Sequence, residues 1–157
     1  MSNETLANLL HEDRSFPPDP AFTAQANGTA ALYAAADADY EGFWADQART
    51  YVSWSKPFTQ VLDWSNAPFA KWFADGELNA AYNCVDRHVE AGRGDKVALH
   101  WIGEPGDTRD VTYADLHREV QLAANALTDL GLGKGDTVAI YLPMIPEAVV
   151  AMLACAR

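Results

Sequence analysis

The sequence is poor in cysteine and in basic residues, and each shortage excludes a class of protein. Its 157 residues include two cysteines, Cys84 and Cys155, which lie far apart and form no CxxC or Cys/His pattern. We therefore expect neither a disulfide nor a zinc site, and we interpret both as small buried apolar residues in a reducing compartment. Lysine and arginine total 11 against 22 acidic residues, a net charge of −11. This balance disfavours nucleic acid and anionic membranes as partners and favours solubility.

Long apolar runs and catalytic motifs are also missing. No stretch approaches the roughly 20 apolar residues that a membrane-spanning helix requires. The N-terminus carries an acid and no basic region, so it does not resemble a secretory signal. The sequence contains no HExxH motif, EF-hand pattern, GxSxG elbow or nucleotide fingerprint. We therefore predict a cytoplasmic protein with no membrane segment, and we assign no catalytic, cofactor-binding or metal-binding residue to this chain.

What is present divides the chain into three parts, the first being a lead-in over residues 1–36. Apolar residues make up 49% of the sequence, which indicates a globular protein. The segment 14–20 contains three prolines and should be extended. We predict that 1–36 is an extended, partly disordered arm, with Phe16 and Phe22 as candidate anchors.

The second part, residues 37–94, is predicted to be helical and rich in aromatic residues. A helix should run from about residue 37 or 39 to 51, with one face formed by Tyr40, Phe43, Trp44, Ala48 and Tyr51. Residues 51–78 lack a clear period and are interrupted by Pro57 and Pro68, which predicts an irregular aromatic segment. A second helix is expected over 78–91, capped by Asn79 and ended by Gly92 and Gly94. Its inward residues should be Leu78, Ala81, Tyr82, Val85 and Val89.

The third part, residues 95–157, has the pattern of an α/β fold. A strand over 96–102 and a return strand over 108–112 flank a turn at 104–107. Thr112 and Asp115 resemble a capping box and open a helix that Gly131 closes. Its apolar face should comprise Leu116, Val120, Ala123, Leu127 and Leu130. The apolar run 137–142 predicts a buried parallel strand ended by Pro143, and Pro146 should start a helix.

Three groups of residues suggest chemistry but have simpler interpretations. The glycine-rich loop 131–136 follows a helix and precedes a strand, which is the reverse of a phosphate-binding loop, and the same holds for 92–96. Asp86, Arg87 and His88 are adjacent on a helix and cannot converge on one atom, so we expect docking or salt bridges, with Asp86 and Arg87 toward the outer side. The remaining histidines, His11, His100 and His117, share no metal spacing, and Ser53, Ser55 and Ser65 lie among aromatic residues.

The last residues predict that the fold is incomplete. Residues 148–156 form an apolar helical run without a closing signal, and the strand over 137–142 has no following strand to pair with. We therefore expect the front piece of a larger α/β protein. Such a piece should expose apolar surface and an unpaired strand edge, which favours association.

Several strings resemble a known family. Residues 63–73 (DWSNAPFAKWF), 76–79 (GELN) and 82–88 (YNCVDRH) are similar to the N-terminal region of AMP-forming acetyl-coenzyme A synthetases. Residues 112–116 (TYADL), 125–127 (NAL) and 135–147 (GDTVAIYLPMIPE) are also similar, and the last string resembles the first shared motif of the adenylate-forming superfamily. The likeness extends from about Phe16 to the end of the chain.

The resemblance implies a fold and a reaction. Members have a large N-terminal domain of two α/β subdomains and a β-barrel, followed by a small mobile domain. They convert acetate and MgATP into acetyl-adenylate and pyrophosphate, and coenzyme A then yields acetyl-CoA and AMP. The family's ATP, carboxylate and CoA motifs match nothing here, so we expect this chain alone to bind none of ATP, CoA or Mg²⁺ and to be inactive. The alternatives are a propionate- or other short-acyl-CoA ligase and a non-catalytic interaction module.

Overall fold

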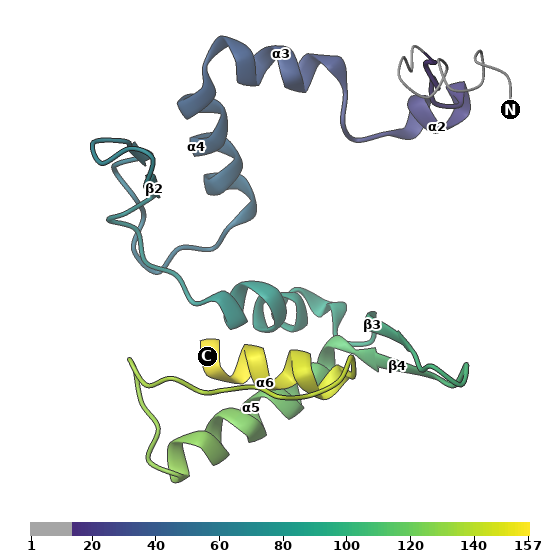
Figure 1. Cartoon of the computed structure of the whole chain (residues 1–157), viewed down its shortest axis with the longest axis vertical. Helices are drawn as coiled ribbons and strands as arrows, with labels where there is room; N and C mark the ends of the chain where they lie inside the picture. The colour runs from purple at the N-terminus through teal and green to yellow at the C-terminus, as the bar shows by residue number, and fades with distance from the viewer. Residues whose placement is uncertain (1–13) are drawn as a thin grey trace, which may run out of the picture. The chain divides into compact units, whose positions relative to one another are not determined.

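The computed structural model describes residues 14–157, which fall into two compact units divided between Tyr40 and Glu41. Figure 1 shows the described elements along the chain. Helices dominate, and the strands form two separate two-stranded antiparallel sheets, β1 with β2 and β3 with β4. The predictions for residues 1–13, including His11, lie outside the described residues.

The first unit contains two helices, α2 (Pro20–Gln25) and α3 (Ala30–Ala38). Residues 14–19 have no regular secondary structure, and α2 and α3 contradict the expectation of an extended arm through residue 36. Asp19 caps α2, because its Oδ1 accepts hydrogen bonds from the backbone N–H groups of Ala21 at 2.7 Å and Phe22 at 3.4 Å. Pro20 occupies the first helical position, where its missing N–H costs nothing. The alanine-rich sequence of α3 favours a helix by propensity.

Helix α4 (Tyr40–Tyr51) confirms the predicted helix but not its buried face. Ala45 and Ala48 are buried, whereas Tyr40, Trp44 and Tyr51 are exposed. The two alanines, together with Phe58 and the neighbouring Trp54, Val61 and Phe73, form a small core that we call the aromatic cluster. Small residues on α4 leave room for these rings, so the large residues of the helix need not point inward.

The segment after α4 is irregular, as predicted, and contains a minimal hairpin of β1 (Leu62–Asp63) and β2 (Lys71–Trp72). Trp54 contacts Phe58 and Phe73 edge-on, with ring centroids 5.1 and 5.6 Å apart. Phe58 and Phe73 contact each other at 4.5 Å. Such tilted ring pairs are the preferred aromatic geometry. Three inner rings therefore organise a segment that has almost no regular structure.

Residues 80–93 form the predicted second helix, but much of it is π-helical, in η1 (Tyr82–Asp86) and η2 (Val89–Arg93). Asn79 caps it as expected, because its Oδ1 accepts a hydrogen bond from Tyr82 N–H at 2.9 Å. Ala81 and Val85 are fully buried. Gly92 has a φ of 74°, a left-handed conformation that glycine adopts freely. Leu78 and Tyr82 are more exposed than predicted, since the wider π-turns shift the buried face.

The α/β part begins with an antiparallel hairpin, β3 (Val97–Ile102) and β4 (Thr108–Thr112). Helix α5 (Tyr113–Asp129) follows directly, and Thr112 Oγ1 caps it by accepting a hydrogen bond from Asp115 N–H at 3.1 Å. Both the hairpin and the cap confirm the sequence prediction. Leu130 was expected on the buried face but is 79% exposed, because it lies beyond the last turn of α5.

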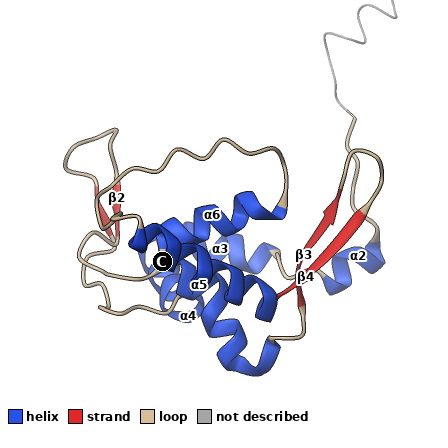
Figure 2. Ribbon diagram, turned by 90° about the horizontal axis from the view of Figure 1, so that it is seen from below, coloured by secondary structure: helices blue, strands red, loops and turns tan. Residues whose placement is uncertain are grey.

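Helix α6 (Pro146–Ala156) lies beside α5 (Figure 1) and completes the core of this part. The core, which we call the aliphatic cluster, comprises Val85, Val111, Leu116, Val120, Val150 and Leu153. The 80–93 helix supplies Val85 and thereby joins this core. Figure 2 shows the β3–β4 hairpin extending away from these helices.

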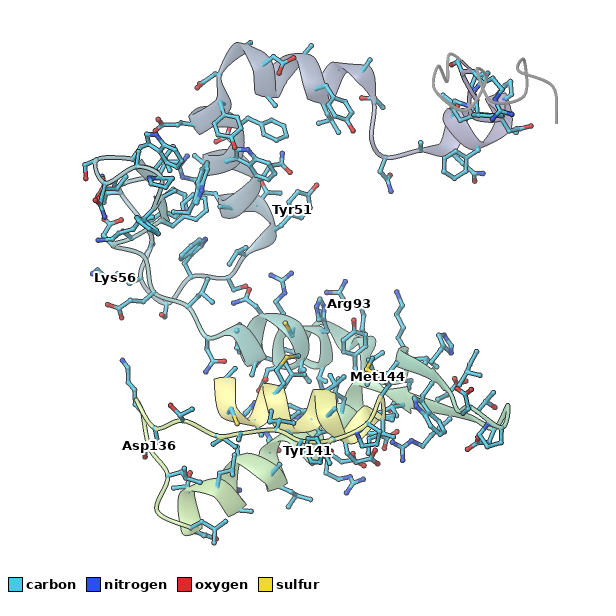
Figure 3. All side chains as sticks on the ribbon, in the orientation of Figure 1. Tyr51, Lys56, Arg93, Asp136, Tyr141 and Met144 are labelled. Carbon is cyan, nitrogen blue, oxygen red and sulfur yellow. The ribbon has the colours of Figure 1, made fainter. Side chains whose placement is uncertain are left out.

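The predicted strand over 137–142 is not formed, although the segment is well defined as an extended loop between α5 and α6. A β-strand forms only when it can hydrogen-bond to a neighbouring strand. Within residues 14–157, no strand pairs with this segment. As expected for an unpaired apolar segment, Val138, Ile140, Tyr141 and Leu142 are all exposed. Figure 3 shows Tyr141 and Met144 on this exposed stretch.

Both cysteines are free, as predicted, but they are exposed rather than buried. The buried side of the 80–93 helix is taken by Ala81, Val85 and Asp86, which leaves Cys84 outside. Helix α6 similarly buries Leu153 and Ala154 instead of Cys155.

Candidate functional site

The 82–88 string forms the centre of a polar junction, which we define as Asn79, Asn83, Asp86, Arg87, His117 and Arg157. Asn83 connects the 80–93 helix to the segment that follows α4. Its Oδ1 accepts a hydrogen bond from Ser53 N–H at 2.8 Å, and its Nδ2 donates to Ser53 O at 2.9 Å. This two-way pairing satisfies both backbone groups of Ser53, which lies where no regular ladder is available.

Arg87 strengthens the same connection. Its Nη1 donates to Tyr51 O at 2.8 Å and lies 3.3 Å from Asn83 Oδ1 and 3.4 Å from Ser53 Oγ. Tyr51 is the last residue of α4, so the guanidinium satisfies a carbonyl that has no partner inside the helix. The Nε of Arg87 is buried and has no hydrogen-bond partner among residues 14–157.

Asp86 connects the helix to α5 and α6. It is 7% exposed, so the prediction that it lies on the outer side is wrong, while the predicted salt-bridge role is confirmed. Its Oδ2 accepts from Arg157 Nη1 at 2.7 Å, and its Oδ1 lies 3.1 Å from His117 Nε2. Gln121 extends this group, with its Nε2 2.9 Å from the same His117 nitrogen. A buried carboxylate must be paired in this way, because desolvating an unpaired charge is very costly.

The junction contains a carboxylate beside an imidazole, as in an acid–base pair, but it contains no nucleophile bonded to that imidazole. Asp86 holds His117 as a carboxylate holds the base in a hydrolytic triad, yet no hydroxyl or thiol is bonded to a histidine in the described part of the chain. His88 instead packs against Tyr113 in a tilted arrangement, with ring centroids 5.0 Å apart. Burial, followed by the charges of Arg93 and Arg87, lowers the pKa of His88. The junction therefore links its helices through paired polar groups.

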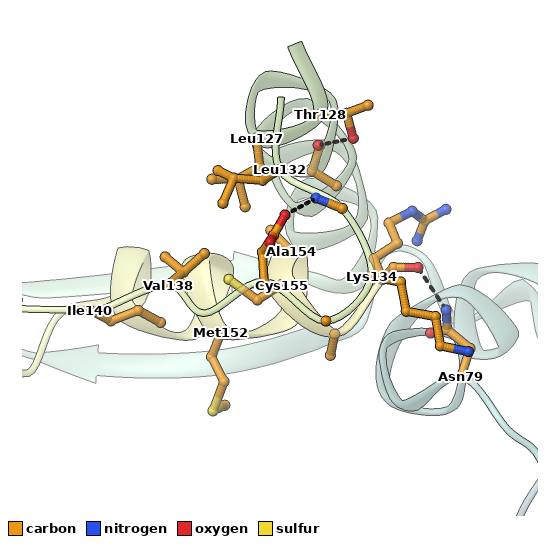
Figure 4. A pocket seen from close by; sticks show the side chains of 16 residues that line it. Asn79, Leu127, Thr128, Leu132, Lys134, Val138, Ile140, Met152, Ala154 and Cys155 are labelled. Carbon is orange, nitrogen blue, oxygen red and sulfur yellow. Dashed lines mark hydrogen bonds between the residues drawn. The ribbon is translucent and has the colours of Figure 1, made fainter. Parts of the chain in front are cut away.

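A groove of about 610 Å³ lies next to the junction (Figure 4). Asn79 and Lys134 lie at one end, and Val138, Ile140 and Met152 lie at the other. The Nδ2 of Asn79 donates to Arg157 O at 2.9 Å, so the junction and the groove share a wall. One side of the groove is formed by the extended 132–140 loop. Apolar side chains line the groove together with the polar Thr128, Lys134, Asp136 and Arg157, so the groove is partly polar.

The β3–β4 hairpin fixes the other end of this loop. Trp101 Nε1 donates to Met144 O at 2.7 Å, and Arg109 Nη2 contacts Glu147 Oε1 at 2.7 Å. The Arg109 hydrogen bond is the main reason that the pKa of Glu147 is lowered. Two contacts thus set where α6 starts relative to the hairpin.

The glycine-rich 131–136 loop lacks the geometry of a phosphate-binding loop. The 131–136 loop follows α5, and Gly131 has a φ of 90°, as in a helix C-terminal turn. Its Gly133 N–H is taken by Asp136 Oδ2 at 2.8 Å instead of facing an anion. No cluster of three or more His, Cys, Asp or Glu residues suited to a metal occurs in residues 14–157. Within the same residues, no helix is both long and apolar enough to span a bilayer.

Sequence reasoning found the string that forms the junction but not its geometry. It assumed 3.6 residues per turn, and the π-helical turns rotate Asp86 to the buried side. Nothing in the spacing linked Asp86 with His117 or Arg157, which are 31 and 71 residues away.

Two family models match the chain. Residues 29–84 match the acetyl-coenzyme A synthetase N-terminus, and residues 85–157 match the AMP-binding enzyme family. The boundary falls inside the 80–93 helix, in the middle of the junction.

Curated relatives and a solved structure agree with these matches. The acetyl-coenzyme A synthetase of Streptomyces avermitilis is 67% identical over 100% of this chain and 24% of its own length. That of Burkholderia lata is 55% identical over 97% of this chain and 24% of its own length. The structure of acetoacetyl-CoA synthetase from Streptomyces lividans matches with a TM-score of 0.74 and 33% identity, covering 88% of this chain and 24% of that one. The chain thus spans about a quarter of the length of these relatives.

Proposed function

The chain belongs to the acetyl-coenzyme A synthetase family, of which it represents the N-terminal region, and we propose that it serves as the N-terminal quarter of an AMP-forming acetate–CoA ligase. The proposed reaction consumes ATP, acetate and CoA and yields AMP, pyrophosphate and acetyl-CoA through an acetyl-adenylate. The observation that carries the proposal is 67% identity to a named acetyl-coenzyme A synthetase over all 157 residues.

The described residues would contribute support rather than chemistry. The polar junction holds the aromatic segment against the helices of the α/β part, through Asn83 and Arg87 on one side and Asp86 on the other. In the proposed enzyme, ATP, CoA and Mg²⁺ would bind to the part of the relatives that this chain does not cover. The partner of this chain would be that remaining adenylation domain.

The acid that is activated is the finer part of the proposal. Identity favours acetate, because the relatives named acetyl-coenzyme A synthetase are 53–67% identical and the acetoacetyl-CoA synthetase is 33% identical. A propionate- or acetoacetate-type ligase is the second candidate, supported by the TM-score of 0.74. The cytoplasmic location expected from the sequence stays a prediction.

A chimera tests the proposal. Residues 1–157 would replace the aligned quarter of the Streptomyces avermitilis enzyme, and acetate-dependent ATP–pyrophosphate exchange would be measured beside the parent enzyme. We expect exchange and acetyl-CoA formation of the same order as in the parent. A chimera that is soluble and folded by circular dichroism but inactive in both assays would contradict the proposal.

The isolated chain provides the complementary measurement. It should support no acetate-dependent exchange, since in the proposed enzyme ATP binds to the part of the relatives that this chain does not cover. Exchange by the purified chain above a no-acetate control would show that the supporting role is wrong. If instead the chimera fails while the isolated chain is a folded monomer, the non-catalytic interaction module becomes the better description.

A further inference from the structure

A small basic surface stands out on this acidic chain. We call it the cationic patch and define it as Arg87, His88, Arg93 and Lys96, at the end of the 80–93 helix and in the turn that follows. Three of the 11 lysines and arginines of the whole chain thus lie within ten residues, although acids outnumber bases two to one. Figure 3 shows Arg93 on the side of the helix that faces away from α6.

The cations of the patch have no carboxylate partner among residues 14–157. Five other cations do form ion pairs with described acids: Arg49, Lys56, Arg109, Arg118 and Arg157. The nearby acids are engaged elsewhere, since Glu90 accepts a hydrogen bond from the Tyr82 hydroxyl at 2.8 Å and Asp115 contacts Thr112 at 2.7 Å. Asp95 lies within the same turn and is exposed. Glu90, Asp95 and Asp115 keep their negative charge, but none of them forms an ion pair with a cation of the patch, and the charges that act on His88 are those of Arg93, Arg87 and Lys96.

Backbone hydrogen bonds gather the patch around the start of α5. Lys96 N–H donates to Arg93 O at 3.1 Å, and Tyr113 N–H donates to Lys96 O at 3.0 Å. Ala114 N–H donates to Gly94 O at 3.0 Å. These bonds hold the turn against the N-terminus of α5, whose dipole adds positive potential. The ring of His88 is fixed there by Tyr113.

The charges of the patch act on a common point, the imidazole of His88. Burial lowers the pKa of His88, and the charges of Arg93, Arg87 and Lys96 lower it further, so all three cations act on one imidazole. The buried Nε–H of Arg87 also lacks an acceptor among the described residues, and a buried donor without a partner is costly. An anion bound beside His88 would offset the repulsion that these three cations exert on its imidazole.

We propose that the cationic patch binds a small phosphate-bearing anion. Guanidinium groups pair with phosphate oxygens through two parallel hydrogen bonds, lysine adds a point charge, and a neutral imidazole adds a donor. A phosphate group offers more acceptor oxygens and more charge than a carboxylate. Free pyrophosphate and the phosphate of a nucleotide share this chemistry. The inference depends on the charge arrangement and not on the proposed reaction.

Calorimetric titration of the full chain with pyrophosphate at pH 7.5 tests the proposal. We expect saturable binding that weakens by about tenfold or more in the double variant R93Q/K96Q, since each charge-assisted bond to phosphate is among the stronger protein hydrogen bonds. The matched control is K71Q/K134Q, which removes two cations outside the patch and should bind as the wild type does. Both variants change exposed side chains, so folding should be unaffected.

The same titration followed by proton NMR of His88 adds a local readout. A bound dianion should raise the pKa of His88 in the wild type and leave it unchanged in R93Q/K96Q. Stronger binding of pyrophosphate than of 3′,5′-adenosine diphosphate would identify free polyphosphate as the source, and the reverse order would identify a nucleotide. The absence of saturable binding, or equal weakening in K71Q/K134Q, would overturn the proposal.

Discussion

The aromatic and aliphatic clusters of the second unit are stabilised in different ways. The aliphatic cluster consists of branched side chains at regular helical spacing on α5 and α6, with Val85 and Val111 added. The aromatic cluster contains Phe58, with Trp54 and Phe73 packed against it, on a segment with only two short strands. The first is organised by repeating backbone hydrogen bonds and the second by individual side chains.

The difference shows what replaces regular structure when it is absent. In the aromatic segment, side chains bond to backbone groups that a helix or sheet would otherwise satisfy. Asp75 accepts from the N–H groups of Thr59 at 3.0 Å and Gln60 at 3.1 Å, and Trp54 Nε1 donates to Ala48 O at 3.0 Å. We therefore expect single substitutions to be more damaging in the aromatic cluster, where each ring and each bond lacks a substitute.

Phe58→Ala is the most damaging change that we predict. Phe58 is 5% exposed and contacts both Trp54 and Phe73, so its loss should lower the free energy of unfolding by about 4 kcal/mol. Urea unfolding followed by tryptophan fluorescence measures this change. Phe69→Ala is the matched control, because Phe69 is 71% exposed and should cost little. Similar losses at the two positions would contradict the aromatic cluster.

Leu116→Ala should cause the second-largest loss of stability. Leu116 is 3% exposed in the aliphatic cluster, and its truncation should cost about 3 kcal/mol, with partial collapse of the helices around the cavity. Urea unfolding followed by circular dichroism at 222 nm reports on α5. Leu122→Ala, on the exposed face of the same helix, provides the control. A cost larger than that of Phe58→Ala would reverse the comparison between the clusters.

Asp86→Ala tests the polar junction between the clusters. It leaves Arg157 and His117 without their shared carboxylate, and we expect a loss of about 2 kcal/mol, below the range for a fully buried pair because Arg157 is partly exposed. Urea unfolding measures it by both probes, and the two transitions should separate if Asp86 couples the clusters. Asp46→Ala removes an exposed pair with Arg49 and should have almost no effect. Equal stability of the two variants would rule out the coupling.

The smallest predicted effect concerns pH and the aromatic segment. The Thr59 hydroxyl and the Gln60 N–H lower the pKa of Asp75 to about 2 from the ordinary value of 3.8. The ionised carboxylate therefore stabilises the fold above about pH 4, and this contribution is lost as the pH falls to about 2. Acid unfolding followed by tryptophan fluorescence should show this dependence in the wild type and much less of it in Asp75→Asn. Thr59→Ala should shift the dependence to higher pH, and an unchanged profile in both variants would contradict the assignment.

The regular part of the fold was predictable from the sequence. Thr112 and Asp115 marked the start of α5, Pro146 marked the start of α6, and alternation in 96–102 marked β3, because each signal acts within a few residues. The strand over 137–142 was not correctly predicted, since a strand requires a partner that local sequence does not supply. Helix α2 was missed because Pro20 was treated as a helix breaker when it is a helix starter, and α3 was missed because its alanine-rich sequence has no buried apolar face that would mark it.

For the polar junction, the sequence indicated which residues are involved but not how they are arranged. Residues 82–88 were singled out, but the outward placement of Asp86 followed from a helix period that η1 does not have. The choice of Ser53, His117 and Arg157 as partners depends on tertiary packing, which no spacing rule contains. The convergence of Arg93 and Lys96 at the start of α5 depends in the same way on a turn geometry.

The sharing of one carboxylate by Arg157 and His117 has an evolutionary consequence. Because Asp86 contacts both side chains, replacing either one alters how strongly the other depends on Asp86. Mutational effects at these three positions should therefore be epistatic, so a substitution tolerated in one background is harmful in another. Lineages would then be expected to change the three residues together or not at all.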